Sequence, residues 1–141
     1  MRILILNGPN LNLLGSREPE IYGELSMEQY LENLRPLFDG TLLEYYQSNH
    51  EGVIIDRLQE GDFDALVINP GAYTHYSYAI ADALRTIAVP KVEVHISNIY
   101  KREEFRRKSV TAPAMDGLIS GFGLEGYRMA VQFLTQNKKA E

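Results

Sequence analysis

The chain has 141 residues and a mass of 16.0 kDa, the size of one compact domain, and its 45% hydrophobic and 23% charged residues are typical of a globular protein. It has no cysteine, which excludes disulfides, thiol nucleophiles and thiolate metal sites and favours a reducing compartment. The net charge of −5 argues against nucleic-acid binding, and the apolar residues 3–6 are too few for a signal peptide or a membrane span, so we expect a cytoplasmic protein with neither partner.

The first third of the chain predicts a strand, a long loop and a helix. The apolar run at residues 2–7 is typical of a short buried strand, and Gly8-Pro9 ends it. A helix is expected from Ser26, which has the form of a capping box with Gln29. Pro36 should kink or end this helix.

The middle of the chain predicts two further strand–helix units. Residues 41–47 favour a strand, and Ser48 with Glu51 offers a second capping box before a helix. Residues 65–69 are a third apolar run, after which Thr74 can cap a helix that extends to Ile87.

The last third adds two strands and a final helix. Strands are expected at residues 91–96 and 116–120, followed by a helix to about Asn137. Strands that alternate with helices imply right-handed crossovers and a parallel sheet covered on both faces. We therefore predict a single α/β domain over residues 1–141, with three layers and a doubly wound five-stranded sheet.

In such folds, ligands bind beyond the carboxyl ends of the strands, near the point where the strand order reverses. The residues at these ends are rich in Asn, Ser, Gly and His, which donate and accept hydrogen bonds without net charge. They are residues 7–10, 48–49, 69–71, 95–97 and 120–121.

Gly121, Gly123 and Gly126 match the pattern G-x-G-x-x-G, which binds dinucleotides when it joins a strand to a helix. No further strand follows it to complete the nucleotide-binding unit. The sequence therefore favours the alternative, in which the glycines allow close packing between the strand and the helix.

His95 is expected at the end of a strand, and Glu93 lies two residues earlier on the same face. A carboxylate beside an imidazole fixes its tautomer and favours its protonated form, which suits an acid or a base. A hydrogen-bonded histidine without a chemical role is the alternative. The three histidines do not show the spacing of metal ligands, so we expect no metal site.

The loop at residues 8–23 is longer than most connections and would lie at the ligand end of the sheet, where long loops often act as lids. Within it, a guanidinium at Arg17 near the phenol of Tyr22 would favour the phenolate. A surface loop with an incidental tyrosine is the alternative.

Residues 101–108 hold five of the 14 lysines and arginines. Such a segment is usually a solvated helix face. On a helix, Arg102 and Arg106 would share one face and could hold a carboxylate.

Three longer motifs resemble the type II 3-dehydroquinases, which are 3-dehydroquinate dehydratases of flavodoxin-like fold. They are ILNGPNLNLLGSREPEIYG at 5–23, NPGAYTH at 69–75 and VEVHISNIYKREEFRRKS at 92–109. The likeness extends in order and spacing over essentially the whole chain. It implies a reversible elimination of water from 3-dehydroquinate to 3-dehydroshikimate through an enolate, without a cofactor, in the shikimate or quinate pathway.

The resemblance also implies catalytic roles. Tyr22, assisted by Arg17, would remove the proton next to the substrate ketone. His95, oriented by Glu93, would protonate the departing hydroxyl, and Asn10 would hold a water at the enolate.

Further positions match residues that bind the substrate or join subunits. The substrate-binding positions are Asn69, His75, Ile96, Ser97, Arg102 and Arg106. Asp82 matches a residue that reaches the site of a neighbouring subunit, and the resemblance implies trimers that assemble into a dodecamer.

Two binding modules share the same fold and serve as alternatives. A phosphorylated receiver would have acidic residues at the end of the first strand and an aspartate after the third, where this chain has Asn7 and Asn69. A flavin phosphate loop would be rich in Ser and Thr, and residues 8–15 contain neither. An inactive structural assembler is a third alternative, which the intact candidate catalytic residues argue against.

Overall fold

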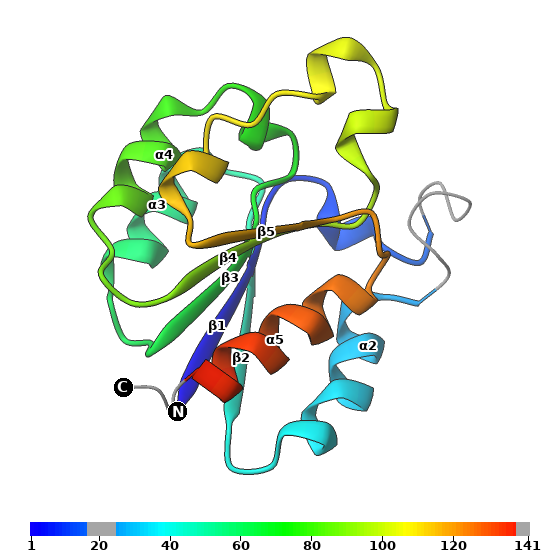
Figure 1. The fold of residues 1–141 in the computed structure, drawn as a ribbon, viewed down its shortest axis with the longest axis vertical. Helices are drawn as coiled ribbons and strands as arrows, with labels where there is room; N and C mark the ends of the chain where they lie inside the picture. Colours follow the sequence, from blue (N-terminus) through cyan, green and yellow to red (C-terminus); the bar gives the residue numbers. More distant parts are fainter. Residues whose placement is uncertain (17–24, 138–141) are drawn as a thin grey trace.

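The computed structural model describes residues 1–16 and 25–137, and its strands form one all-parallel sheet in the order β2-β1-β3-β4-β5 (Figure 1). The strands are β1 (Arg2–Asn7), β2 (Leu42–Gln47), β3 (Ala65–Asn69), β4 (Lys91–His95) and β5 (Gly117–Ser120). The α-helices are α2 (Met27–Leu34), α3 (Glu51–Gln59), α4 (Tyr78–Arg85) and α5 (Glu125–Asn137). The chain runs outward from β1 to β2 and then returns to the other side of β1, so the strand order reverses between β1 and β3. The prediction of a doubly wound, five-stranded parallel sheet is confirmed.

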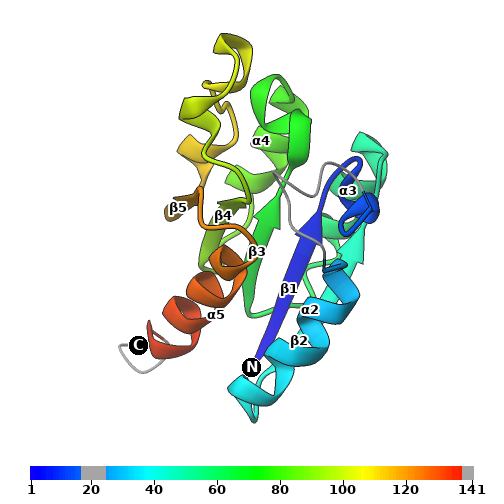
Figure 2. The same cartoon turned by 90° about the vertical axis from the view of Figure 1, so that its right-hand side faces the viewer.

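Helices cover both faces of the sheet, with α2 and α5 on one side and α3 and α4 on the other (Figures 1 and 2). Successive side chains of β1 point to opposite faces of the sheet: Ile3 and Ile5 pack with α2 and α5, whereas Leu4 and Leu6 pack with α3 and α4. Because both faces are buried, the strand is a continuous apolar run rather than an alternating one. In the part of the chain that the structure describes, no helix has the length and apolar character needed to cross a membrane.

The first predicted helix has the expected start and end. The Ser26 hydroxyl accepts the amide N–H of Gln29 at 3.1 Å, and the Gln29 side chain accepts the amide N–H of Ser26 at 2.9 Å. This capping box satisfies two donors that a helix start leaves without partners. The α-helix ends at Leu34, and Pro36 lies in the 3₁₀ helix η2 (Arg35–Phe38) that follows.

The second predicted capping box is wrong. Glu51 is the first residue of α3, and the residue before the helix is His50, so Glu51 does not occupy the third helical position that the box requires. Ser48 accepts the amide N–H of His50 at 3.0 Å, and the Glu51 carboxylate accepts the hydroxyl of Ser77 at 2.5 Å.

The prediction that Thr74 caps the next helix is also wrong. Thr74 lies in the 3₁₀ helix η3 (Gly71–His75), and α4 begins later, with Ser77 accepting the amide N–H of Ile80 at 3.1 Å. The hydroxyl of Thr74 instead contacts the carboxylate of Glu93 in the neighbouring strand.

Residues 101–108 do not form one helix face. The segment contains the end of one 3₁₀ helix, η4 (Ile99–Lys101), and the whole of another, η5 (Glu104–Arg106), which are separated by an extended backbone at Arg102. Arg102 and Arg106 therefore do not share a helix face, although both reach the same cavity.

Gly126 allows the close strand–helix packing that the sequence favours, and Gly121 allows a close approach to Asn98, whereas nothing lies within 4 Å of a Cβ atom on Gly123. A Cβ atom on Gly121 would lie 2.9 Å from the Cβ of Asn98, and one on Gly126 would lie 3.0 Å from a methyl carbon of Val94. Gly121 also has a φ of +100°, which L side chains rarely adopt.

Candidate active site

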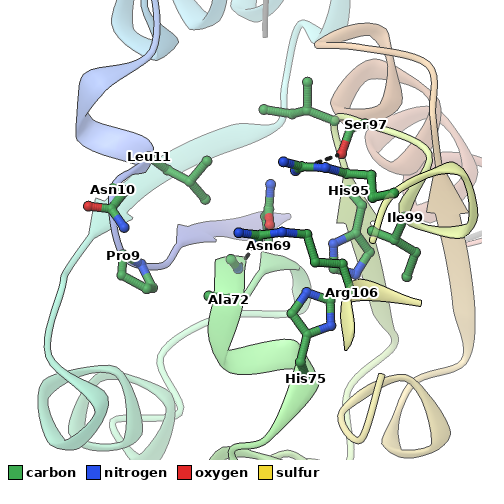
Figure 3. Close-up of a pocket in the computed structure, with 13 residues that line it drawn as sticks. Pro9, Asn10, Leu11, Asn69, Ala72, His75, His95, Ser97, Ile99 and Arg106 are labelled. Carbon is green, nitrogen blue, oxygen red and sulfur yellow. Dashed lines mark hydrogen bonds between the residues drawn. The ribbon is translucent and has the colours of Figure 1, made fainter. Parts of the chain in front are cut away.

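A cavity of about 110 Å³ lies beyond the carboxyl ends of β1, β3 and β4, at the point where the strand order reverses (Figure 3). The lining residues expected from the sequence are Asn10, Asn69, His75, His95, Ile96, Ser97, Arg102 and Arg106; the others are Pro9, Leu11, Gly71, Ala72 and Ile99. The parallel register aligns Asn7 with Asn69, which brings the first and third strand ends together. The strand ends therefore meet where the sequence places the site.

The lining carries cationic and neutral polar groups. It includes the guanidinium groups of Arg102 and Arg106 and the imidazoles of His75 and His95, and none of these described lining residues is acidic. In Figure 3 the side chains of Arg106, His75 and Asn69 lie around the same space. A cavity of this kind suits a small anion that also carries hydroxyl groups.

His95 ends β4 and pairs with Glu93 on the same face of the strand. The distance from His95 Nε2 to Glu93 Oε2 is 2.6 Å, and both side chains are buried. When the carboxyl group is ionised it can only accept, so the Nε2–H of the imidazole donates. The structure thus brings together the pair that the sequence singles out.

Three hydroxyl groups surround the Glu93 carboxylate, and sequence reasoning did not identify them as site residues. Thr111 donates to Oε1 at 2.5 Å, while Thr74 and Ser109 lie 2.9 Å and 3.1 Å from Oε2. Burial acts to raise the pKa of the Glu93 carboxyl, but the contacts from the imidazole and the hydroxyls hold this pKa below its ordinary value. Thr74 and Ser109 lie within the family motifs, which is the one signal that could have found them.

His75 has a defined tautomer. Its Nδ1–H donates to the carbonyl oxygen of Lys108 at 2.7 Å, since a carbonyl can only accept. Burial lowers the pKa of His75, and the positive charges of His95, Arg106 and Arg102 lower it further. The neutral ring therefore offers Nε2 as a hydrogen-bond acceptor.

The two arginines are held by local contacts. Arg106 Nε donates to Glu103 at 3.0 Å, and the Arg106 guanidinium lies 4.8 Å from the ring centre of Phe105. Arg102 Nη1 lies 3.5 Å from the hydroxyl of Ser97. These contacts orient two cationic groups toward one cavity, which suits recognition of a carboxylate.

A buried hydrogen-bond network orients Asn69. Its Nδ2 donates to the hydroxyl of Tyr127 at 3.1 Å, and its Oδ1 accepts the amide N–H of Gly71 at 3.0 Å. The Tyr127 hydroxyl donates in turn to Asn7 at 2.7 Å, and Asn7 Nδ2 lies 3.4 Å from the hydroxyl of Tyr45. Burial raises the pKa of Tyr127 strongly and that of Tyr45 to about 12, so both phenols remain neutral. The sequence carries no signal for this role of Tyr127.

Asn10 is held in the left-handed conformation, with φ of +69°. Its amide N–H donates to Asn49 Oδ1 at 3.0 Å, and the same oxygen accepts from Gln47 Nε2 at 3.0 Å. The preceding backbone is equally constrained, because a Cβ atom on Gly8 would lie 2.4 Å from the carbonyl oxygen of Pro70. Asn49, Gln47 and Gly8 therefore position the residue that was expected to hold a water.

Four of the expected residues are not among the described residues that line this cavity. Glu93 contacts the lining residue His95 but does not itself line the cavity. Arg17 and Tyr22 lie outside the described residues. Asp82 lies on α4 and pairs with Arg85 at 3.2 Å, and its side chain is 78% exposed. Its expected reach into the site of a neighbouring subunit stays a prediction.

The described residues contain no group of three or more His, Cys, Asp or Glu side chains that could hold a metal ion. The sheet order and the polar cavity define a flavodoxin-like α/β protein with a site for a small hydroxylated anion.

Comparisons with known proteins agree on one family. The sequence model described as "Dehydroquinase class II" matches residues 1–135. The chain is 57% identical over 143 residues to the 3-dehydroquinate dehydratase of Thermotoga maritima, covering 100% of this chain and 98% of that protein. It is 55% identical over 139 residues to that of Clostridium botulinum (strain Loch Maree), covering 96% and 95%.

A solved structure matches equally well. The type II dehydroquinase of Butyrivibrio crossotus superposes with a TM-score of 0.90 at 54% identity, over 96% of this chain and 97% of that one. The chain belongs to the class II dehydroquinase family.

Proposed function

We propose that this chain is a type II 3-dehydroquinate dehydratase, which eliminates water from 3-dehydroquinate to give 3-dehydroshikimate. The observation that carries the proposal is the single cavity that joins the His95–Glu93 pair to the cationic groups of Arg102 and Arg106. The substrate is a small polyhydroxylated carboxylate. Such a molecule needs an anion-binding side, neutral hydrogen-bonding groups and a proton donor within one site.

Elimination of water beta to a ketone needs a base for the carbon acid, stabilisation of the enolate and an acid for the leaving hydroxyl. His95 supplies the acid: Glu93 binds Nε2, which leaves Nδ1 to exchange the proton. Tyr22 is the base. A tyrosine with a pKa of about 10 is only about a thousandth ionised at pH 7, a cost near 4 kcal/mol that Arg17 offsets in part.

The remaining residues bind the substrate and the intermediate. The guanidinium groups of Arg102 and Arg106, with Ser97 and the backbone at Ile96, bind the carboxylate. Asn69 and the Nε2 of His75 bind the substrate hydroxyls. Asn10, held by Asn49, positions the water at the enolate oxygen.

The finer features follow the family resemblance. Residues 1–141 form one catalytic domain, and residues 8–23 form its lid. Asp82 is contributed to the site of a neighbouring subunit within trimers that assemble into a dodecamer. The enzyme acts in the cytoplasm, in the shikimate or quinate pathway, and without a cofactor.

The test follows the ultraviolet absorbance of the conjugated enone when purified chain is mixed with 3-dehydroquinate. One sample is treated with a chelator. Another is incubated with substrate and borohydride, which would trap an imine intermediate by reduction, and is desalted before the assay. A rising absorbance in both samples is expected. Folded protein that gives no absorbance change would refute the dehydratase, and activity lost only after borohydride would refute the assigned chemistry.

A further inference from the structure

The Glu93 carboxylate sits in an unusual setting for a buried charge. It is fully buried, and three neutral hydroxyl groups contact it in addition to His95. We name these Thr74, Ser109 and Thr111 the hydroxyl cluster. They come from η3 and from the segment before the 3₁₀ helix η6 (Ala112–Ala114), and nothing in the proposed proton transfer uses them directly.

We propose that the hydroxyl cluster keeps Glu93 ionised whether or not His95 carries its proton, so that the imidazole and not the carboxylate stores the proton that the reaction transfers. Thr74, Ser109 and Thr111 are thereby positioning residues. The inference rests on the proposed dehydratase function, since it concerns the proton donor of that reaction.

The argument begins with the state that forms after proton transfer. While His95 is protonated, the imidazolium balances the charge of Glu93. Once His95 has given up its proton, Glu93 is an unbalanced anion in the protein interior, which burial strongly disfavours. Without other donors, the carboxylate would compete with the imidazole for the proton.

Hydroxyl groups can compensate for this loss because their O–H bonds rotate toward the strongest acceptor. A carboxylate has about four acceptor positions, of which the imidazole uses one. Thr111 binds Oε1 at 2.5 Å, and Thr74 and Ser109 approach Oε2. Hydrogen bonds to an ionised acceptor are roughly twice as strong as those between neutral groups.

The cluster is also held rigidly by its own contacts. The hydroxyl of Thr74 lies 2.7 Å from those of both Ser109 and Thr111. The amide N–H of Ala112 donates to the Ser109 hydroxyl at 2.9 Å, and that of Val110 donates to the carbonyl of Thr74 at 2.7 Å. Because these contacts fix the oxygens in place, the cluster is organised before any proton moves.

The other charged groups that face the pair come from different elements. His75 projects from η3, and Arg102 and Arg106 reach the cavity from the segment after β4. None of these three residues is substituted in the variants that remove a hydroxyl of the cluster. A change in titration after such a removal is therefore attributable to the cluster.

The test is a nitrogen-15 NMR titration of the histidine side chains in the full chain, with the His95 signals assigned from their loss in His95→Gln. Thr111→Val removes one hydroxyl at nearly constant volume. Losing this donor destabilises the unbalanced Glu93 anion more than the protonated pair. We expect the titration midpoint of the pair to move to higher pH by about one unit.

Thr86→Val is the matched control, because the hydroxyl of Thr86 donates to the carbonyl of Ala83 at the end of α4, away from the cavity. It should leave the midpoint unchanged, and Thr111→Ser, which restores a hydroxyl, should return the midpoint toward that of the parent protein. A folded Thr111→Val protein with the parent midpoint would overturn the inference.

Two further measurements separate the possible failures. If Thr111→Val does not fold, the same titration is made on Ser109→Ala, a substitution at a partly exposed position. The same upward shift of the midpoint is expected. A folded Ser109→Ala protein that keeps the parent midpoint would overturn the inference. The limb of the kcat profile that reports the pair should shift with the NMR midpoint, whereas a purely structural role would lower activity equally at every pH. A parent protein that titrates as expected but gives no enone would refute the proposed function and leave the role of the cluster in the ionisation of Glu93 standing.

Discussion

The substitution Tyr127→Phe should both destabilise the protein and weaken substrate binding, because one hydroxyl joins the core to the site. This hydroxyl donates to Asn7 at 2.7 Å and accepts from Asn69 at 3.1 Å, and the tyrosine is fully buried. Phenylalanine keeps the ring and its packing, so the change removes the two hydrogen bonds and little else.

The expected magnitude follows from the groups that lose their partner. Asn7 Oδ1 and Asn69 Nδ2 are both left buried, and each buried polar group without a partner costs about 1–3 kcal/mol. Allowing for some relaxation of the two amides, the free energy of unfolding should fall by about 2–4 kcal/mol, and Tm by roughly 5–15 °C. Because Asn69 is no longer oriented, KM should rise by about three- to tenfold, which corresponds to about 1 kcal/mol.

The assay is denaturant unfolding together with steady-state kinetics on the same preparations. Tyr30→Phe is the matched control: its hydroxyl makes a longer, 3.3 Å contact with Glu125 outside the cavity and should contribute at most about 1 kcal/mol. The slope of the unfolding curve should be the same in all three proteins, since the surface exposed on unfolding does not change. Equal stability and equal KM in Tyr127→Phe and Tyr30→Phe would show that the network does not position Asn69.

Three other substitutions test the proposed roles. Tyr22→Phe should lower kcat by about 10²–10⁴ while stability stays the same, and near-normal turnover would eliminate Tyr22 as the base. Arg106→Ala should raise KM about 10- to 100-fold by removing a charged contact to the carboxylate; an unchanged KM would refute that contact. Glu93 has a folded-state pKa below its unfolded value, so its ionisation stabilises the fold above about pH 4.5, and this stabilisation is lost as the pH falls through the folded-state pKa. The Tm advantage of the parent over Glu93→Gln should therefore shrink on acidification toward pH 3, and an advantage that stayed constant would contradict the sign.

Much of the fold could be predicted because its causes are local. The run of apolar residues at 3–6 predicts a strand buried on both faces, and β1 does serve both cores with alternate side chains. The Ser26 capping box involves residues three apart, so it is readable without the tertiary structure. The general location of the site follows as well, because parallel strands place all their carboxyl ends at one edge of the sheet.

Predictions failed where a polar side chain had both a local and a distant partner available. Thr74 has the spacing of a helix cap, but its hydroxyl binds Glu93, 19 residues away. The run of charges at 101–108 has helical spacing, but the extended backbone at Arg102 divides it into two short 3₁₀ helices. A local sequence pattern does not show which of two possible contacts forms, because the outcome depends on how segments that are distant in the sequence pack together.

The sequence by itself determined the order of the strands and helices along the chain, the edge of the sheet that carries the site, and, through three long motifs, the family. Only the tertiary structure decided which groups support the candidate catalytic side chains. The hydroxyl cluster joins residues from two segments around a carboxylate that lies on a third, and Tyr127 contacts Asn7 across 120 residues of chain. Hydrogen bonds of this kind leave no periodic pattern in the sequence, because their donors and acceptors come together only after the sheet and its helices have packed.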